Sequence, residues 1–172
     1  MSHTHLTLNP TAVQDDYAQY LAQVNDVARY SQQKGNHPFG AIFVLDGKVL
    51  LEAHNTVNTE KNHTRHAEMN LVDKLYASAL TADQLRQGIV FASTEPCTMC
   101  ATALVNSGVK HMVYGCSAAE LAKIAPWDGY IDISLQEVVA RCVSGNTIQV
   151  QGPLCEAEAL AVHHDFWPKL RA

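Results

Sequence analysis

Apolar residues recur every three or four positions over the N-terminal part of the chain. Between Thr11 and Gln33 this spacing predicts an amphipathic helix. The positions are Val13, Tyr17, Tyr20, Leu21, Val24, Val27 and Ala28. Gly35 follows, and Pro38 disfavours helical backbone at the residue before it. The helix is therefore expected to stop at Gly35.

Strand-like and helical patterns alternate along the rest of the chain. The apolar runs 41–45 and 48–53 flank Asp46-Gly47, a pair typical of tight hairpins. Further strands are expected over 89–93, 109–114 and 147–151, further helices over 64–78, 97–107 and 156–170, and two more helices at the capping-box patterns Ser117-x-x-Glu120 and Ser134-x-x-Glu137. This order predicts an α/β fold, a three-layer α/β/α sandwich with a mixed five-stranded sheet.

Composition fits one globular domain over 1–172, with 1–10 as a flexible polar tail, because 47% of the residues are hydrophobic and 17% charged. Residues 1–10 hold no signal-peptide core, and no run approaches the ~18 apolar residues of a membrane span. Five cysteines, two of them in a Cys-x-x-Cys pair, favour metal or redox chemistry in the cytoplasm over disulfides. The net charge of -5 argues against nucleic acid as a partner.

Two short motifs carry the candidate chemistry, His66-Ala67-Glu68 and Pro96-Cys97-Thr98-Met99-Cys100. Zinc binds imidazole and thiolate ligands tetrahedrally, and a catalytic site leaves one of the four positions to water. Cys97 and Cys100 at a helix start can face one point, where the helix N-terminus favours thiolates. His66, expected in the first turn of another helix, completes the set. The prediction is one zinc ion per chain.

Glu68 is expected to act on protons and not to bind the metal. Its position two residues after His66 on a helix directs it away from the imidazole, within reach of the metal's water. A carboxylate there can take a proton from water and return it to a ring nitrogen and a leaving amine. His-x-Glu followed by Pro-Cys-x-x-Cys is the signature of zinc deaminases.

Two other interpretations of the cysteines stay open. A Cys-x-x-Cys pair alone can be a thioredoxin-type redox centre, which leaves His66 and Glu68 unexplained. A structural zinc site needs a fourth protein ligand, such as His63 or Cys116. The remaining cysteines, Cys116, Cys142 and Cys155, are otherwise expected to be buried thiols.

With these motifs the chain resembles the cytidine deaminase-like superfamily, and within it the branch of guanine deaminases and tRNA adenosine deaminases. The resemblance runs from about Tyr17 to Trp167. The matching stretches are Pro38-Phe39-Gly40-Ala41, His66-Ala67-Glu68-Met69, Ser93-Thr94-Glu95-Pro96-Cys97-Thr98-Met99-Cys100 and Val113-Tyr114-Gly115. The resemblance implies the superfamily's fold, zinc-dependent hydrolytic deamination and a homodimer.

The same resemblance implies further substrate-binding residues. Asn55 would hydrogen-bond the substrate ring, although an asparagine here can also be a turn residue. Phe39 would form a pocket wall, although a phenylalanine before a strand is often core. The Ala67 amide would donate to a base carbonyl, and the carbonyl of Glu95 or its neighbour would accept from the leaving amine.

The segment after Tyr114 bears on the choice of substrate. Guanine deaminases carry an acidic residue there that recognises N–H groups of the purine, and Asp128 falls on that position. The run 125–129 departs from the family's glycine, aromatic and acidic pattern, so Asp128 as a turn residue stays open. Trp127 either stacks on a ring or packs beneath the loop. Glu120, the competing carboxylate, is accounted for by its capping box.

The expected function is hydrolytic deamination of a small nucleobase-like ring, with guanine first. The alternatives are wobble adenosine in tRNA, disfavoured by the acidic balance, and cytosine, a nucleoside, a pterin or a triazine. A non-enzymatic partner subunit is a further alternative, against which the intact Glu68 argues. The run His163-His164-Asp165 is not expected to form a second metal site, because consecutive residues do not share a helix face. The resemblance allows the aromatic residues after it to reach the pocket, from this subunit or a partner.

Overall fold

The structure, a computed structural model, describes residues 10–125, 131–143, 148–164 and 166–167, with side chains from Tyr17 onward. The expected tail over 1–10 lies outside this range except for its last residue. Trp127 and Asp128 also lie outside the described residues.

A mixed sheet of five strands forms the centre of the molecule, in the order β2-β1-β3-β4-β5. Strand β1 (Gly40–Leu45) pairs antiparallel with β2 (Lys48–His54) and with β3 (Ile89–Thr94). Strand β3 pairs parallel with β4 (His111–Cys116), and β4 with β5 (Gln149–Gln151). The predicted three-layer fold with a mixed five-stranded sheet is confirmed.

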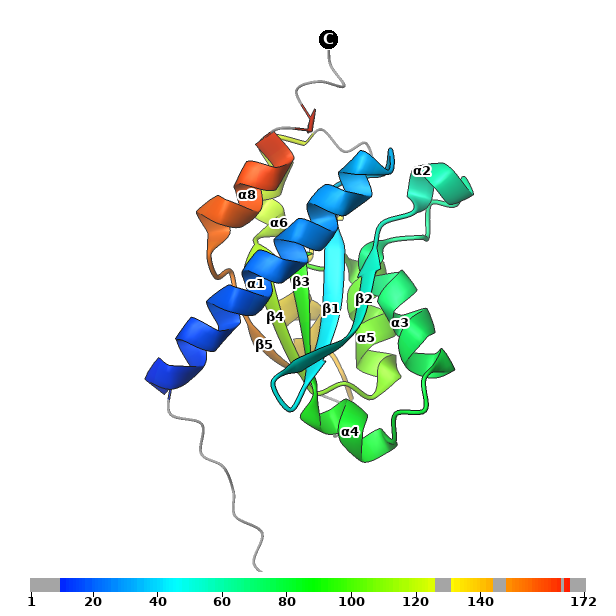
Figure 1. Cartoon of the computed structure of the whole chain (residues 1–172), viewed down its shortest axis with the longest axis vertical. Coiled ribbons are helices and arrows are strands. Elements are labelled where there is room, and N and C mark those ends of the chain that lie inside the picture. Colours follow the sequence, from blue (N-terminus) through cyan, green and yellow to red (C-terminus); the bar gives the residue numbers. More distant parts are fainter. Residues whose placement is uncertain (1–9, 126–130, 144–147, 165, 168–172) are drawn as a thin grey trace, which may run out of the picture.

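Helices cover both faces of this sheet (Figure 1). Helices α1 (Pro10–Gln33) and α8 (Glu156–His164) pack on one face, and α3 (Ala67–Ala77) and α5 (Thr98–Ser107) on the other. Strand β1 serves both layers because its side chains alternate. Phe43 packs with the α3 and α5 side, whereas Ile42 packs with α1.

Several element boundaries differ from the sequence prediction. Helix α3 begins at Ala67, so His66 is its N-cap and not a first-turn residue, and Cys97 is likewise the N-cap of α5. The prediction missed the short helices α2 (Val57–Glu60) and α4 (Ala82–Gln87). A capping box at Thr81 and Gln84 opens α4, and this pattern was visible in the sequence.

Two further short helices, α6 (Ala118–Ala122) and α7 (Leu135–Ala140), follow β4. The expected capping box at Ser134 is complete. The one at Ser117 is half formed, because Ser117 accepts from the Glu120 N–H while the Glu120 carboxylate pairs with Lys123. Ser117 therefore caps α6 by accepting from the Glu120 N–H, and the Glu120 side chain takes no part in the cap.

The carboxyl ends of the parallel strands β3 and β4 meet at one edge of the sheet, where Thr94 is in register with Cys116. Close packing here requires Gly115, because a Cβ would come within 2.5 Å of the Ser93 carbonyl and 2.8 Å of the Ala159 Cβ. In α/β sheets the crevice beyond such strand ends is the usual ligand site.

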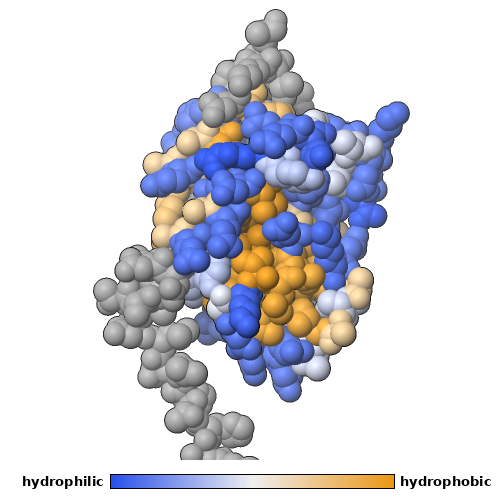
Figure 2. Space-filling model, viewed as in Figure 1, coloured by the Kyte–Doolittle hydropathy of each residue, from blue (hydrophilic) through white to orange (hydrophobic). Residues whose placement is uncertain are grey.

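The surface view shows apolar side chains gathered over the strands beside α1 (Figure 2). Leu50 in the edge strand β2 is 44% exposed.

None of the described helices has the length and apolar content to cross a membrane.

Candidate metal centre and active-site pocket

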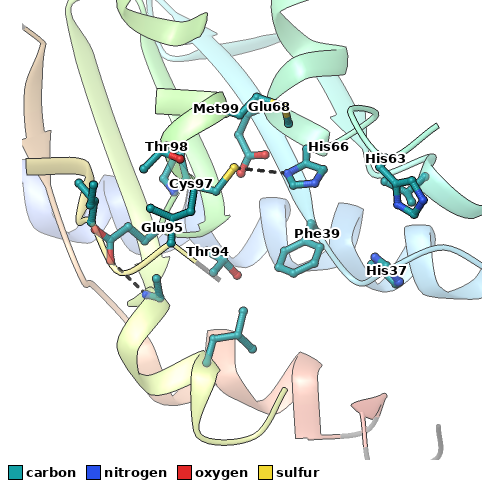
Figure 3. A pocket seen from close by; sticks show the side chains of 16 residues that line it. His37, Phe39, His63, His66, Glu68, Thr94, Glu95, Cys97, Thr98 and Met99 are labelled. Atoms are coloured by element: carbon teal, nitrogen blue, oxygen red, sulfur yellow. Dashed lines mark hydrogen bonds between the residues drawn. The ribbon is translucent and has the colours of Figure 1, made fainter. Parts of the chain in front are cut away.

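A cavity of about 490 Å³ lies beyond the carboxyl ends of strands β3 and β4. Its walls come from the approach to β1, α2 and the loop after it, the start of α3, the turn from β3 into α5, α6, and the residues just before α7. The lining residues used below are His37, Phe39, Val57, His63, His66, Glu68, Thr94, Glu95, Cys97, Ala118, Leu121, Ile131 and Ile133. Figure 3 shows that His66, Cys97 and Glu68 converge at one end, while His37 and His63 lie at the other.

Three side chains are placed to bind one metal ion. Nδ1 of His66 lies 3.6 Å from Sγ of Cys97 and 3.5 Å from Sγ of Cys100, and the two sulfurs are 3.6 Å apart. Tetrahedral zinc with its usual Zn–S and Zn–N distances would separate its ligand atoms by roughly 3.5–3.8 Å. The donor set and its spacing therefore fit zinc.

The described part of the chain supplies three protein ligands to this site. Among the described residues, no further His, Cys, Asp or Glu joins the group formed by His66, Cys97 and Cys100. A structural zinc site would require a fourth ligand, so the arrangement is that of a catalytic site with one open position. Cys116, one candidate for that ligand, instead contacts the Thr94 hydroxyl.

The local environment favours a thiolate at Cys97. A hydrogen bond from Cys100 lowers the pKa of Cys97 to about 4, against the opposing effect of burial. The same hydrogen bond, together with burial, raises the pKa of Cys100 well above its ordinary value. Contact with Cys97 also raises the pKa of His66. Because only deprotonated ligands bind a metal, zinc would displace the protons that these shifts favour on Cys100 and His66.

Glu68 lies in the first turn of α3 and is buried, with 6% of its surface exposed. The pKa of its carboxyl is raised above the ordinary value because the group is buried, although nearby His66 opposes this shift. Its carboxylate lies beside the ligand group but does not belong to it (Figure 3). This is the location that a proton carrier requires.

Phe39 lies in the cavity wall, where the sequence placed it. Its ring packs on that of His163, 5.1 Å between centroids, and on Trp167, 6.4 Å away. Trp167 also contacts His37. The C-terminal aromatic residues of the same chain therefore support the pocket from behind.

Asn55 is buried and forms a turn. Its Oδ1 accepts from the Val57 N–H at 3.0 Å, and its own carbonyl accepts from Ser31 Oγ. Val57 lines the cavity, so Asn55 fixes part of the wall. Ala67, the other residue of this region assigned from the sequence, is fully buried at the start of α3.

Glu95 also lines the cavity, but its side chain has a role that sequence reasoning missed. The carboxylate accepts hydrogen bonds from two backbone N–H groups, those of Ala118 and Leu135. The prediction from the sequence gave a role only to the backbone carbonyl of Glu95 or of its neighbour. Other lining residues were also missed as pocket residues, among them His37, Thr94, Leu121 and Ile131, and only a three-dimensional structure brings them together.

Comparison with known proteins identifies the family. Residues 14–116 match the family described as the cytidine and deoxycytidylate deaminase zinc-binding region. The chain belongs to this family. The deaminase domain thus spans the ligand group and Glu68, and its cofactor is zinc, for which His66, Cys97 and Cys100 are in position.

Relatives of this deaminase act on different rings. A probable cytosine deaminase from Schizosaccharomyces pombe is 30% identical over 164 residues, 93% of this chain and 98% of that protein. A tRNA-specific adenosine deaminase from Bacillus subtilis is 35% identical over 96 residues, 56% of this chain and 59% of that protein. The structure of a guanine deaminase from Nitrosomonas europaea has a TM-score of 0.71 at 22% identity and covers 98% of both chains. These deaminases resemble the chain, and the substrates in their names differ.

Proposed function

We propose that this deaminase removes the amino group of a free nucleobase by hydrolysis, and that guanine is its preferred substrate. The observation that carries the proposal is the buried Glu68 carboxylate beside a three-ligand metal group, at the end of a cavity with largely apolar walls. A planar base fits such walls, and the carboxylate of Asp128 would favour a ring edge that presents N–H donors.

Zinc, when bound by His66, Cys97 and Cys100, would lower the pKa of water and make it nucleophilic at neutral pH. Glu68 takes the proton from the attacking water and delivers it to the ring nitrogen next to the reacting carbon. Oxygen bonds to the carbon that bears the amino group. Glu68 then takes the second proton from the hydroxyl now on that carbon and passes it to the amine, and the carbon–nitrogen bond breaks to give ammonia and the oxo base.

The pocket walls hold the ring and exclude water. Phe39 and Leu121 offer apolar surface to the faces of a planar base. A net charge of -5 opposes the phosphate contacts on which binding to tRNA depends. A free base therefore suits this chain better than an anticodon loop.

Cytosine is the second candidate, because the probable cytosine deaminase from S. pombe is similar over nearly the whole of both chains. Cytosine deamination would use the same proton transfers by Glu68. It would not need the carboxylate of Asp128, because the N–H groups that this carboxylate would bind belong to guanine.

Ammonia release from zinc-loaded protein tests the proposal, with guanine, adenine, cytosine, the matching nucleosides and a tRNA anticodon stem-loop as substrates. Guanine turnover that drops in Asp128→Ala, with no loss in the surface control Asp26→Ala on α1, supports the proposal. Turnover of cytosine alone would establish the second candidate. Reaction of the stem-loop alone would overturn both and show that the acidic charge balance does not exclude RNA.

A further inference from the structure

Glu95 lies between the parallel strands and the metal-binding turn. Its N–H donates to the Cys116 carbonyl at 2.8 Å, which ties it to the end of β4, and the metal ligand Cys97 follows two residues later. Only 9% of its surface is exposed. A carboxylate so buried needs hydrogen-bond donors, and its partners indicate its role.

The two carboxylate oxygens of Glu95 bind the starts of two different helices. Oε2 accepts from the Ala118 N–H at 3.0 Å, and Oε1 accepts from the Leu135 N–H at 2.8 Å. These are the first residues of α6 and α7, whose N–H groups have no partner within their own helices. Bonds from such groups to a carboxylate are among the stronger protein hydrogen bonds. One side chain therefore joins two points that are distant in the sequence.

The carboxylate does not point toward the reacting position. Figure 3 shows the Glu95 side chain extending away from Glu68 and His66, toward the start of α6. With both oxygens engaged by backbone N–H groups, it is suited to hold structure and not to exchange protons.

Described residues close to these two anchors form part of the pocket wall. Leu121, Ile131 and Ile133 all line the cavity. Ile131 is 57% exposed and Ile133 41% exposed, so burial in the core contributes little to their placement. Their position therefore depends on how the two anchors are held.

Both anchors have further support. Near the first, Ser117 donates to Oε1 of Glu156 in α8 through its N–H at 2.9 Å and through its hydroxyl at 2.7 Å. Near the second, the Gln136 side chain donates to the Tyr114 hydroxyl at 3.1 Å, and the Leu135 side chain is buried in the core. Loss of the Glu95 carboxylate should therefore free the N–H groups of Ala118 and Leu135 without unfolding α6 or α7.

We propose that Glu95 is a positioning residue that sets substrate affinity by holding residues 118–125 and 131–135, at the starts of α6 and α7, against the metal centre. The inference rests on the proposed function, since it concerns the pocket of that same deaminase site. It assigns Glu95 a role through its side chain, separate from any role of its backbone carbonyl. The carboxylate shapes the wall that faces the base, while Glu68 performs the chemistry.

The test is Glu95→Gln, which keeps the size of the side chain but replaces one acceptor oxygen by a donor. The matched control is Glu120→Gln, a nearby carboxylate in α6 that pairs only with Lys123 at the surface. In Glu95→Gln we expect the KM for guanine to rise about tenfold while kcat stays within about threefold, because one hydrogen bond to a charged acceptor is lost. Amide exchange at Leu135 should become about tenfold faster, with the zinc content unchanged.

An unchanged KM together with unchanged exchange at Leu135 would overturn the proposal. A fall in kcat much larger than the change in KM would also overturn it, since Glu95 would then act in the chemistry. If wild-type protein does not turn over guanine, only the proposed substrate fails. The same KM and exchange comparison is then made with the base that the wild type deaminates fastest, and a faster exchange at Leu135 without a rise in that KM counts against the proposal.

Discussion

The indole N–H of Trp167 donates to Nδ1 of His163 at 3.2 Å and thereby decides which nitrogen of this buried imidazole carries the proton. An indole N–H can only donate, so Nδ1 must accept, and the neutral ring keeps its proton on Nε2. Nε2 lies 3.0 Å from Oγ1 of Thr94 and therefore donates to that hydroxyl. Since Thr94 lines the pocket, the C-terminal residues reach the pocket wall through a neutral His163.

His163 should make the stability of the protein depend on pH. Burial, and then the neighbouring His164, lower the pKa of His163 to about 4, below the ordinary value of 6.5. Because the folded-state pKa lies below the unfolded one, the stabilisation is complete above pH 6.5 and is lost as the pH falls through about 4. We expect this group alone to lower the free energy of unfolding by about 2 kcal/mol between pH 7.5 and pH 5.

Urea unfolding of wild-type, His163→Gln and His164→Gln proteins at both pH values measures this contribution. His164 is exposed, and its variant should keep most of the pH dependence, because burial contributes more than His164 to the lowered pKa of His163. The side chains in contact with His163 are Thr94, Phe39 and Trp167, and none of them titrates in this range. Equal pH dependence in wild type and His163→Gln would contradict the assignment of a neutral imidazole.

Replacement of Glu68 by glutamine should separate metal binding from catalysis. We expect Glu68→Gln to lose turnover by about 10²–10⁴-fold, because general acid–base catalysis contributes that much and the amide cannot carry the proton. Zinc should remain at one ion per chain, because Glu68 stands outside the ligand group. Ammonia release and zinc analysis on the same samples check both expectations, with Glu52→Gln in the edge strand β2 as the control. Turnover near the wild-type rate would exclude Glu68 as the proton carrier.

Removal of zinc should abolish activity and lower thermal stability together. A ligand that binds only the folded state at about 100 times its Kd adds roughly 2.7 kcal/mol, so the Tm should drop by roughly 5–10 °C on chelation. Readdition of zinc should restore both properties. Cys97→Ser should behave like the chelated protein, whereas Cys155→Ser, at an exposed thiol outside the site, should behave like wild type. A Tm unaffected by chelation would mean that the ion is not bound in the resting protein.

The sequence was sufficient for the order of the five strands and for the ligand group, and both successes have a local cause. The hairpin around Asp46-Gly47 follows from turn chemistry, and the buried strand at 89–93 from a short apolar run. His66, Cys97 and Cys100 belong to motifs whose spacing is set within two helix starts. Such features depend on neighbouring residues, which a sequence displays directly.

What the sequence did not provide depends on contacts between distant segments. The bonds from Glu95 to Ala118 and Leu135 span 23 and 40 residues, and the bond from Thr94 to His163 spans 69. No periodicity or spacing rule reports a contact of this kind. The N-cap position of His66 was missed for a different reason, since helix ends are the least certain part of a pattern.

Asn55 offers a test that distinguishes a turn residue from a substrate ligand. Its Oδ1 holds the Val57 N–H, and serine can form the same kind of turn with its hydroxyl, but the shorter serine lacks the Nδ2 amide group with which asparagine could also reach a substrate ring. We therefore expect Asn55→Ser to keep its stability but to raise the KM for guanine by about tenfold, the effect of one lost hydrogen bond. Asn55→Ala should show the same rise in KM and, in addition, a loss of about 1 kcal/mol in the free energy of unfolding, because the turn loses its acceptor. Guanine kinetics and thermal unfolding of both variants provide the comparison. If Asn55→Ser matches wild type in both properties while Asn55→Ala is only less stable, then Asn55 shapes the wall at Val57 and does not contact the base.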